Sequence, residues 1–180
     1  RISLSYYSGI DDIIFDTFGL DGRWGNNTIS GHYRRVFNER LVGNFLLANS
    51  RFFTEFGLGG DYGLVSFNEI DDNTISGDFS WFKSSNSTIK FGSQVKWLGF
   101  EYTNKFNEDI QFEIKTDPIE FANYIKLKYE PNDLMIVEPG LRLNYYNVYP
   151  DSLYPDLRLG FKYILSDDRY LNLSVGNYHQ

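Results

Sequence analysis

The two histidines are the first candidates for chemistry, because a neutral imidazole serves as a general base and as a metal ligand. His32 and His179 are separated by most of the 180-residue chain, and neither stands at a His-x-x-His or His-Glu spacing. The chain contains no cysteine, which excludes thiolate metal sites and cysteine nucleophiles. We therefore predict no metal site and no cofactor, and we expect both histidines to line a wet wall.

Carboxylate pairs and a glycine-rich segment are weaker candidates. The chain has three adjacent carboxylate pairs, Asp11-Asp12, Asp71-Asp72 and Asp167-Asp168. Neighbouring residues of a strand point to opposite faces, so a pair on a strand cannot act as an acid/base couple, while calcium binding by pairs in loops stays open. No Lys-Ser/Thr follows the glycine-rich segment 57–63, and no Gly-x-Ser-x-Gly is present. We expect no catalysis, and a triad assembled across strands stays an alternative.

Composition limits the class of protein. With 42% apolar and 23% charged residues, the chain is expected to fold and not to remain disordered. The mean hydropathy of -0.39 is too polar for membrane helices, so any membrane crossing would use strands. The net charge of -7 argues against a nucleic-acid partner, since phosphate binding needs a basic surface.

Alternation of apolar and polar residues indicates the elements that position these side chains. In 135–146 the odd positions are apolar or aromatic, while the even positions include Arg142 and Asn144. The segments 157–165 and 171–176 repeat this pattern. Charge therefore lies deep within each strand, which is typical of a strand between lipid and a wet lumen. The sequence predicts an all-β fold, part of an antiparallel up-and-down transmembrane β-barrel.

The same pattern predicts about nine strands and two kinds of connection. We expect strands at 1–8, 24–37, 40–56, 64–83, 88–103, 119–130, 134–148, 155–165 and 169–179. Tight polar turns are expected at 38–39, 84–87, 131–133 and 166–168, and they alternate with longer connections at 9–22, 57–63, 104–118 and 149–154. Outer-membrane barrels have short periplasmic turns and longer extracellular loops. We therefore place the four tight turns on the periplasmic side.

Aromatic residues are expected to form a belt at each membrane interface. Near the tight turns these residues are Phe37, Trp81, Tyr129 and Tyr163. Toward the long connections they are Trp24, Trp97, Tyr102 and Tyr145. Two such belts are what a bilayer interface at each end of the strands would select.

Two strands contain irregularities. The segment 40–56 breaks its alternation, and we expect a bulge there that resets the register, because an arginine such as Arg51 at the bilayer midplane would cost about 2–4 kcal/mol. With this bulge the lipid-facing residues would be Leu46, Ala48, Phe52 and Phe56. Pro139 has no N–H to donate to a neighbouring strand, so a bulge or a local gap is expected beside it.

The ordered strands resemble the barrel of TonB-dependent outer-membrane receptors. The resemblance rests mainly on Gly-Leu-Arg-Leu-Asn-Tyr at 140–145, on Pro-Asp-Leu-Arg-Leu at 155–159 and on Gly-Asn-Tyr-His-Gln at 176–180. Segments 121–129 and 89–92 are also similar to that family. The proline-arginine pair often seen in the family is replaced by Pro-Asp at 155–156, which leaves the subfamily open.

The resemblance implies a 22-stranded barrel with an N-terminal plug, energised by TonB through a periplasmic box peptide. Residues 1–180 would form a partial barrel domain of about nine strands, without the plug, the signal peptide and the remaining strands. The implied function is active uptake of a scarce nutrient, such as an iron chelate, cobalamin or an oligosaccharide, across a Gram-negative outer membrane. The implied partners are outer-membrane lipid, the protein's own plug, the TonB complex and the ligand.

The substrate-binding candidates are polar or aromatic residues on the expected lumen wall: Asp78, Gln94, Lys96, Arg142, Asn144, Tyr146, Arg158 and Lys162. Loop residues such as Trp24, Tyr62 and Tyr149 suit a sugar, a chelate or a peptide alike. Two other classes of function stay open. One is a membrane β-barrel enzyme, a protease or a phospholipase, with His32 near a serine or an acid. The other is a soluble sheet used for adhesion, in which a second layer would cover the apolar face.

Overall fold

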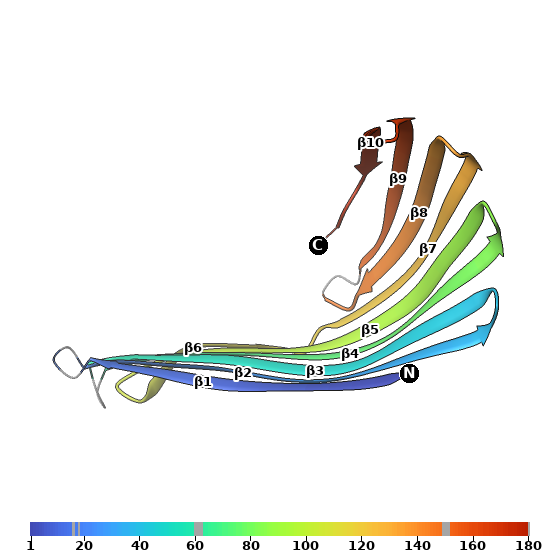
Figure 1. Cartoon of the computed structure of the whole chain (residues 1–180). Helices are drawn as coiled ribbons and strands as arrows, with labels where there is room; N and C mark the ends of the chain where they lie inside the picture. Colours follow the sequence, from blue (N-terminus) through green and yellow to red (C-terminus); the bar gives the residue numbers. More distant parts are fainter. Residues whose placement is uncertain (16, 18, 60–62, 149–151, 180) are drawn as a thin grey trace.

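Ten antiparallel strands form one continuous curved sheet in the computed structural model (Figure 1). The structure describes residues 1–15, 17, 19–59, 63–148 and 152–179. The strands are β1 Ile2–Phe15, β2 Leu20–Asn38, β3 Leu41–Leu58, β4 Leu64–Ser84, β5 Ser87–Phe106, β6 Asp109–Thr116, β7 Ile119–Asn132, β8 Met135–Tyr146, β9 Ser152–Ser166 and β10 Arg169–Gly176. In these residues no helix is long and apolar enough to cross a membrane.

The strands pair in chain order, except that both β6 and β7 pair with β5 and not with each other, which confirms the predicted antiparallel meander. The sheet is not closed, because β1 and β10 do not pair with each other. Two-residue connections at 39–40, 85–86, 133–134 and 167–168 confirm the four tight turns. We call the end of the sheet that carries these turns the turn end, and the opposite end the loop end.

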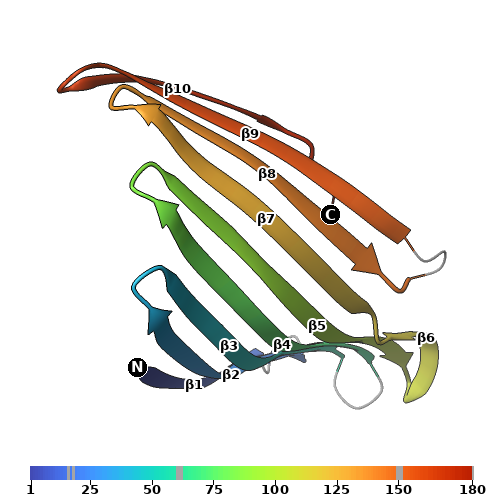
Figure 2. The same ribbon diagram turned by 90° about the vertical axis from the view of Figure 1, so that its right-hand side faces the viewer.

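β6 and β7 are two halves of one strand that runs along β5. Phe100 pairs with Thr116 and Trp97 pairs with Ile119, so both halves keep the same register. The backbone N–H of Leu98 donates to the carbonyl oxygen of Pro118 at 2.9 Å. Pro118 itself has no N–H to donate, and the strand is interrupted there (Figure 2). Counted this way the ten strands make nine, as the alternation predicts.

The expected connections at 9–22 and 104–118 were wrong, since both regions contain paired strand. β1 continues to Phe15 and pairs with β2 from Leu20 onward. Glycines and adjacent aspartates resemble turn signals, but here they lie in a long hairpin. In the second region β6 has an alternating pattern of its own, with Phe112 and Ile114 on one face and Glu113 on the other. At the chain end the predicted strand 169–179 stops at Gly176.

The sheet has a concave inner face and a convex outer face. In Figure 1 the C-terminus lies on the concave side of β9 and β10. His179, close to that end, contacts Asp156 of β9, which places Asp156 on the inner face. Arg142 pairs directly with Asp156 and therefore shares that face. The predicted lumen wall is thus the concave side.

On the turn-end side of the outer row of Asn49, Asn73 and Trp97, adjacent rows of cross-strand partners differ sharply in polarity. One outer row runs Leu4, Gly31, Leu47, Ile75, Val95, Phe121, Tyr145 and Leu153. The neighbouring inner row runs Ser5, Ser30, Ala48, Thr74, Lys96, Glu120, Tyr146 and Ser152. In the described residues no second layer covers the outer face, and Leu159 and Leu173 remain 47% and 65% exposed. The outer face is therefore an uncovered apolar surface.

At the loop end of β1 to β6 this polarity is reversed. An outer row there runs Asp12, Arg23, Glu55, Phe67, Thr103 and Glu113. The neighbouring inner row runs Ile13, Gly22, Phe56, Ser66, Asn104 and Phe112. The reversal occurs at the outer row of Asn49, Asn73 and Trp97, where Asn49 Nδ2 donates to Asn73 Oδ1 at 2.8 Å.

The expected bulge in 40–56 was wrong. β3 keeps one register with β4 along its whole length, so Leu46, Ala48, Phe52 and Phe56 lie on the inner face and not toward lipid. Arg51 lies on the outer face, one row beyond the reversal, where it forms an ion pair with Glu69. The prediction failed because it placed Arg51 within the bilayer, whereas its row lies beyond the apolar band.

The turn-end aromatic belt is present on the outer face. Phe91 stacks on Phe79 with ring centroids 5.2 Å apart, and Phe45 packs edge-on against Phe79 at 5.6 Å, next to the predicted belt residue Trp81. At the other border Trp97 and Tyr145 lie on the outer face as expected. Trp24 and Tyr102 do not, because their registers place them on the inner face at the loop end.

The ladder beside Pro139 has the expected local gap. β7 and β8 pair at Lys126 with Gly140 and again at Tyr129 with Val137, and the two intervening positions are unpaired. Pro139 keeps its place opposite Leu159 on the other side. The missing N–H of Pro139 therefore interrupts the pairing of β8 with β7, while the pairing with β9 is continuous.

Candidate functional site

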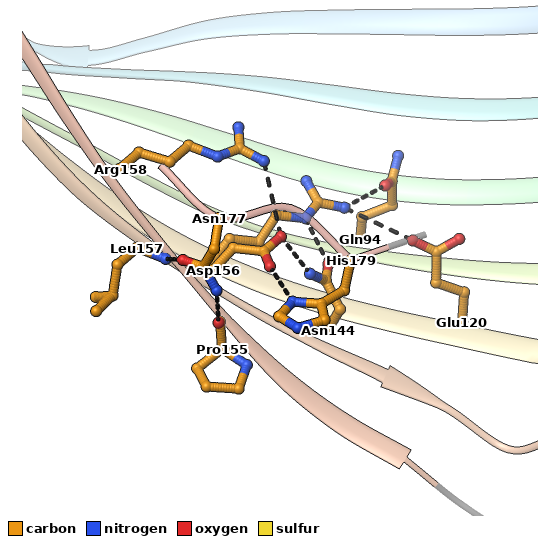
Figure 3. A network of polar contacts seen from close by, with 10 residues as sticks. Gln94, Glu120, Asn144, Pro155, Asp156, Leu157, Arg158, Asn177 and His179 are labelled. Atoms are coloured by element: carbon orange, nitrogen blue, oxygen red, sulfur yellow. Dashed lines mark hydrogen bonds and ion pairs between the residues drawn. The ribbon is translucent and has the colours of Figure 1, made fainter. Parts of the chain in front are cut away.

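A polar network on the inner face of β5, β7, β8 and β9 is the first candidate site (Figure 3). Asp156 and Asn144 lie at its centre, and each is only 2% exposed. Asn144 Nδ2 donates to Asp156 Oδ2 at 2.9 Å, and Arg142 Nε donates to Asn144 Oδ1 at 2.6 Å. Alternation on β8 puts Arg142 and Asn144 on one face, and the β8/β9 register brings Asp156 to them.

Arg142 extends this network toward β7 and β5. Its Nη2 lies 3.4 Å from Gln94 Oε1 and 3.7 Å from Glu120 Oε1. Ala122 stands between Gln94 and Asn144 in the cross-strand row. A methyl group at this position leaves room for the guanidinium to reach across β7. The result is a chain of charged and amide groups that spans four strands.

The segment after β10 folds back onto the inner face and joins the network. His179 Nδ1 lies 2.7 Å from Asp156 Oδ1, and its ring stacks on Tyr154 with centroids 4.8 Å apart. Asn177 Nδ2 donates to the Pro155 carbonyl oxygen at 2.9 Å, while its Oδ1 accepts from the Leu157 N–H at 2.7 Å. Both oxygens of the buried Asp156 carboxylate are therefore in use.

Arg158 marks the edge of the network. Its Nη2 lies 3.8 Å from Asp156 Oδ2, and its guanidinium lies 4.6 Å from the centre of the Tyr178 ring. Next to Arg158 lies a groove of about 420 Å³. Its lining includes Gly140 and Gly160, which have no side chain to fill it. The groove is lined by lysine and arginine side chains, by two tyrosine rings and by several aliphatic side chains, which suits a polar ligand with apolar surface. The described residues contain no cluster that could hold a metal ion.

The other predicted site residues lie on the same inner face but outside this network. Tyr124 Oη donates to Asp78 Oδ1 at 2.6 Å, and Lys96 Nζ lies 3.6 Å from Asp72 Oδ2. The rings of Tyr146 and Tyr154 are 6.2 Å apart. Lys162 Nζ lies 4.3 Å over the ring of Tyr170.

Gly92 provides the space in which Tyr124 reaches Asp78. A Cβ at Gly92 would lie 2.6 Å from Asp78 Oδ1 and 2.7 Å from Tyr124 Cε1. We expect Gly92→Val to lower the free energy of unfolding by about 1–2 kcal/mol, since overpacking forces side chains or backbone to shift. Thermal unfolding of the intact protein in detergent measures this effect.

Gly140→Val is the matched control for this substitution. Gly140 is also a strand glycine of the inner face, but a Cβ there would meet its nearest atoms at 3.6 and 3.7 Å, which is ordinary contact. Both variants gain the same strand propensity. Equal unfolding temperatures for the two variants would contradict the role assigned to Gly92.

The sequence singled out Gln94, Arg142, Asn144 and Arg158, which the structure brings together. It did not select Glu120, Asp156 and His179, which complete the network. Asp156 was recognisable as a polar-face residue, but only the strand register shows that it lies opposite Arg142. His32 lies on the inner face, and within the described ranges it has no hydrogen-bond or ion-pair partner. Tyr62 and Tyr149 lie outside the described residues.

The inner face at the loop end is a second candidate surface. It is lined by large apolar and aromatic side chains, which are Trp24, Phe52, Phe56, Ile70, Phe100, Tyr102, Phe112 and Ile114. Asn68 lies among them, and its Oδ1 is buried without a hydrogen-bond partner in the described structure. Aromatic rings beside an unused amide oxygen suit a ligand that has both flat apolar surface and hydrogen-bond donors.

The outer face at the loop end carries paired charges. Arg23 lies 3.3 Å from Asp12, Lys115 lies 3.4 Å from Glu101, and Arg51 pairs with Glu69. Burial raises the pKa of the Asp71 carboxyl above its ordinary value, and the negative charge of Glu69 raises it further, while Arg51 opposes both. Exposed ion pairs of this kind contribute little stability, but they indicate an aqueous environment.

Asp71→Asn is expected to stabilise the protein at neutral pH. Because the pKa of Asp71 is raised in the folded state, its ionised form costs stability above that pKa, and the cost disappears as the pH falls to the ordinary value of 3.8. The variant should therefore unfold at a higher temperature than the parent at pH 7, and the difference should vanish near pH 3.8. Asp72→Asn, which loses the contact with Lys96, should not stabilise; the same gain in both variants would refute this explanation.

The comparisons with known proteins show a similarity in fold and none in sequence family. No protein-family model matches the sequence, and no curated protein matches it. Among solved structures, the chain is similar to the siderophore receptor PirA from Pseudomonas aeruginosa, with 12% sequence identity and a TM-score of 0.47. The similarity covers 95% of this chain and 41% of that receptor, so the chain spans less than half of the receptor's length.

Proposed function

We propose that this chain forms part of the barrel of a TonB-dependent outer-membrane receptor, which actively takes up a scarce nutrient such as an iron chelate, cobalamin or an oligosaccharide. The observation that carries the proposal is the polarity of the two faces. Toward the turn end the outer face is apolar and the inner face polar, and beyond the row of Trp97 the outer face becomes charged. A wall that crosses a bilayer and continues into water has this distribution.

The dimensions of the apolar band support this placement. On β4, Trp81 of the turn-end belt and Asn73 of the reversal row are eight positions apart. At about 3.3 Å per residue this is about 26 Å of strand, close to the ~25 Å apolar band of outer-membrane barrels before strand tilt is considered. Two sheet edges, at β1 and β10, lack partners in the described structure. Further strands would satisfy them, as a bilayer requires.

The inner face supports a route for a polar solute. At the loop end, aromatic side chains and the unused Asn68 oxygen offer a capture surface. Farther into the wall the network around Asp156 offers charges and amides that are already engaged with one another, and such groups bind a passing ligand weakly. A ligand held tightly outside and weakly inside can be released inward once a plug rearranges. In this proposal the loop end of the inner face captures the ligand, and the network around Asp156 lets it pass.

Uptake measurements in cells test the proposal. Cells with and without the intact protein would be given a radiolabelled ferric siderophore, cyanocobalamin or a maltooligosaccharide, with and without an uncoupler of the inner-membrane proton gradient. We expect protein-dependent uptake of one probe, and its loss with the uncoupler. Uptake that survives the uncoupler would indicate a passive pore and refute active transport. That the chain has no catalytic activity stays a prediction.

A further inference from the structure

β6 is an edge strand inside the wall. It pairs only with β5 among the described strands, and all eight of its residues are exposed. The edges at β1 and β10 lie at the two ends of the sheet, where further barrel strands would continue it. The edge of β6 differs, because β7 continues its line and β8 ends opposite Glu120 of β7. β8 does not extend far enough along the sheet to pair with β6, so among the described strands one edge of β6 stays unpaired (Figure 2).

The backbone groups on this edge can be identified from the ladder. The N–H of Leu98 donates to Pro118, so even-numbered residues of the interrupted strand face β5 at this point. Antiparallel pairs alternate along a ladder, and therefore Ile114 and Thr116 also direct their backbone groups to β5. Glu113 and Lys115 direct theirs to the free edge. An exposed row of such groups is a template for another strand.

The side chains of β6 indicate what kind of strand would fit. On the inner face Phe112 and Ile114 are 51% and 41% exposed, and the Phe112 ring packs against Tyr102 at 6.0 Å. On the outer face Lys115 is paired with Glu101, whereas Glu113 has no ion-pair partner among the described residues. A strand beside β6 would cover both apolar side chains and would need a cation opposite Glu113.

We infer that the free edge of β6 binds an extended segment of another protein, which adds an antiparallel strand to the sheet. That segment carries apolar side chains on its inner side, a basic residue opposite Glu113 and an acidic residue opposite Lys115. A small molecule would not satisfy a row of backbone groups, whereas an added strand does so at every second residue. That this edge lies outside the membrane rests on the proposed function. That β6 has an unpaired edge among the described strands does not.

A second copy of the chain is a poorer occupant. Antiparallel pairing of β6 with its own copy would make the strands of the two sheets run in opposite directions. Two barrels inserted in one membrane have the same orientation, so their walls cannot meet in that way. The partner is therefore a different polypeptide, presented at the loop end.

A fluorescent peptide tests the inference on the intact protein in detergent. The probe Thr-Glu-Ile-Lys-Val-Thr would place its Lys opposite Glu113 and its Glu opposite Lys115 in antiparallel register. We expect saturable binding, measured by fluorescence anisotropy, and binding at least about fivefold weaker for the peptide with Glu and Lys exchanged. Equal affinity for both peptides, or no binding of the first, would overturn the inference.

Two variants of Glu113 sharpen the test. Glu113→Pro removes the N–H on the free edge and leaves the donors that face β5 in place, so peptide binding should be lost while the unfolding temperature stays unchanged. Glu113→Lys should weaken the first peptide and strengthen the exchanged one. Unaltered binding by both variants would exclude this edge as the site. The peptide assay does not measure transport. Its result can therefore be interpreted even if the uptake experiment refutes the proposed function.

Discussion

Leu159→Arg is expected to lower the free energy of unfolding of the intact protein in lipid vesicles by about 2–4 kcal/mol, the cost of an arginine near the bilayer midplane. Leu159 lies on the outer face, midway among the outward positions of β9, between Pro139 and Val175. No described protein layer covers it. Its side chain would meet hydrocarbon, where a guanidinium has neither water nor a counter-ion.

Ser174→Arg provides the control for this substitution. Ser174 lies on β10 opposite Gly160, on the inner face, at nearly the same depth. An arginine there would remain in the wet lumen, and we expect a change within ±0.5 kcal/mol. Denaturant titration of both variants in vesicles measures the difference. In a soluble sheet Leu159→Arg would instead be harmless, because an exposed leucine would be exchanged for an exposed charge, and such a result would contradict the membrane placement.

Asp156→Ala is expected to have the second largest effect, a loss of about 3 kcal/mol in the free energy of unfolding. The carboxylate is almost fully buried and holds Asn144 and His179, with Arg158 close by. Its removal leaves the buried Asn144 amide without its acceptor, and it leaves His179 and Arg158 without the carboxylate that they contact. Thermal unfolding at neutral pH measures the loss, and folding-back of the segment after β10 should be lost with it.

Asp156→Asn separates charge from hydrogen bonding. The amide keeps an acceptor oxygen for Asn144 but cannot balance Arg158 or a protonated His179. We expect about half of the loss seen with alanine. Lys162→Ala, on the same strand and face, should change little, because Lys162 only lies over the Tyr170 ring. Equal, small effects of all three substitutions would show that the network contributes no stability.

Strand number and tight turns could be predicted from the sequence because both are local. The turns at 85–86 and 167–168 are flanked by period-two alternation on each side, which is sufficient to place them. The same alternation predicts that Arg142 and Asn144 lie on one face of the sheet. The same alternation is present in β6, but the polar residues around it and Pro118 are typical of a connection, so this strand was not predicted.

The network around Asp156 could not be predicted, because it depends on registers between strands. Arg142 reaches Gln94 only since Ala122 stands between Gln94 and Asn144, and no single strand specifies that alignment. His179 joins the network by leaving its strand, which alternation alone does not indicate. The alternation of residues along each strand therefore predicts which side chains face inward, but it does not predict which of them contact one another.

The error at β3 has a separate cause. Alternation shows which residues share a face, but not which face is wet at a given height. Arg51 and Phe52 are ordinary for a wall whose polarity reverses beyond Trp97, and they look anomalous only if the whole strand is placed in lipid. The reversal becomes visible when rows of several strands are compared at once.

Single cysteines on β3 can show which positions face lipid and which face water, since the chain has no cysteine of its own. Leu47 and Glu55 share the outer face on either side of the reversal, and Ala48 lies on the inner face next to Leu47. With the intact protein in lipid vesicles and a water-soluble thiol reagent, we predict rapid labelling of Glu55→Cys and Ala48→Cys and almost none of Leu47→Cys. Labelling of Leu47→Cys as fast as Ala48→Cys would contradict the account.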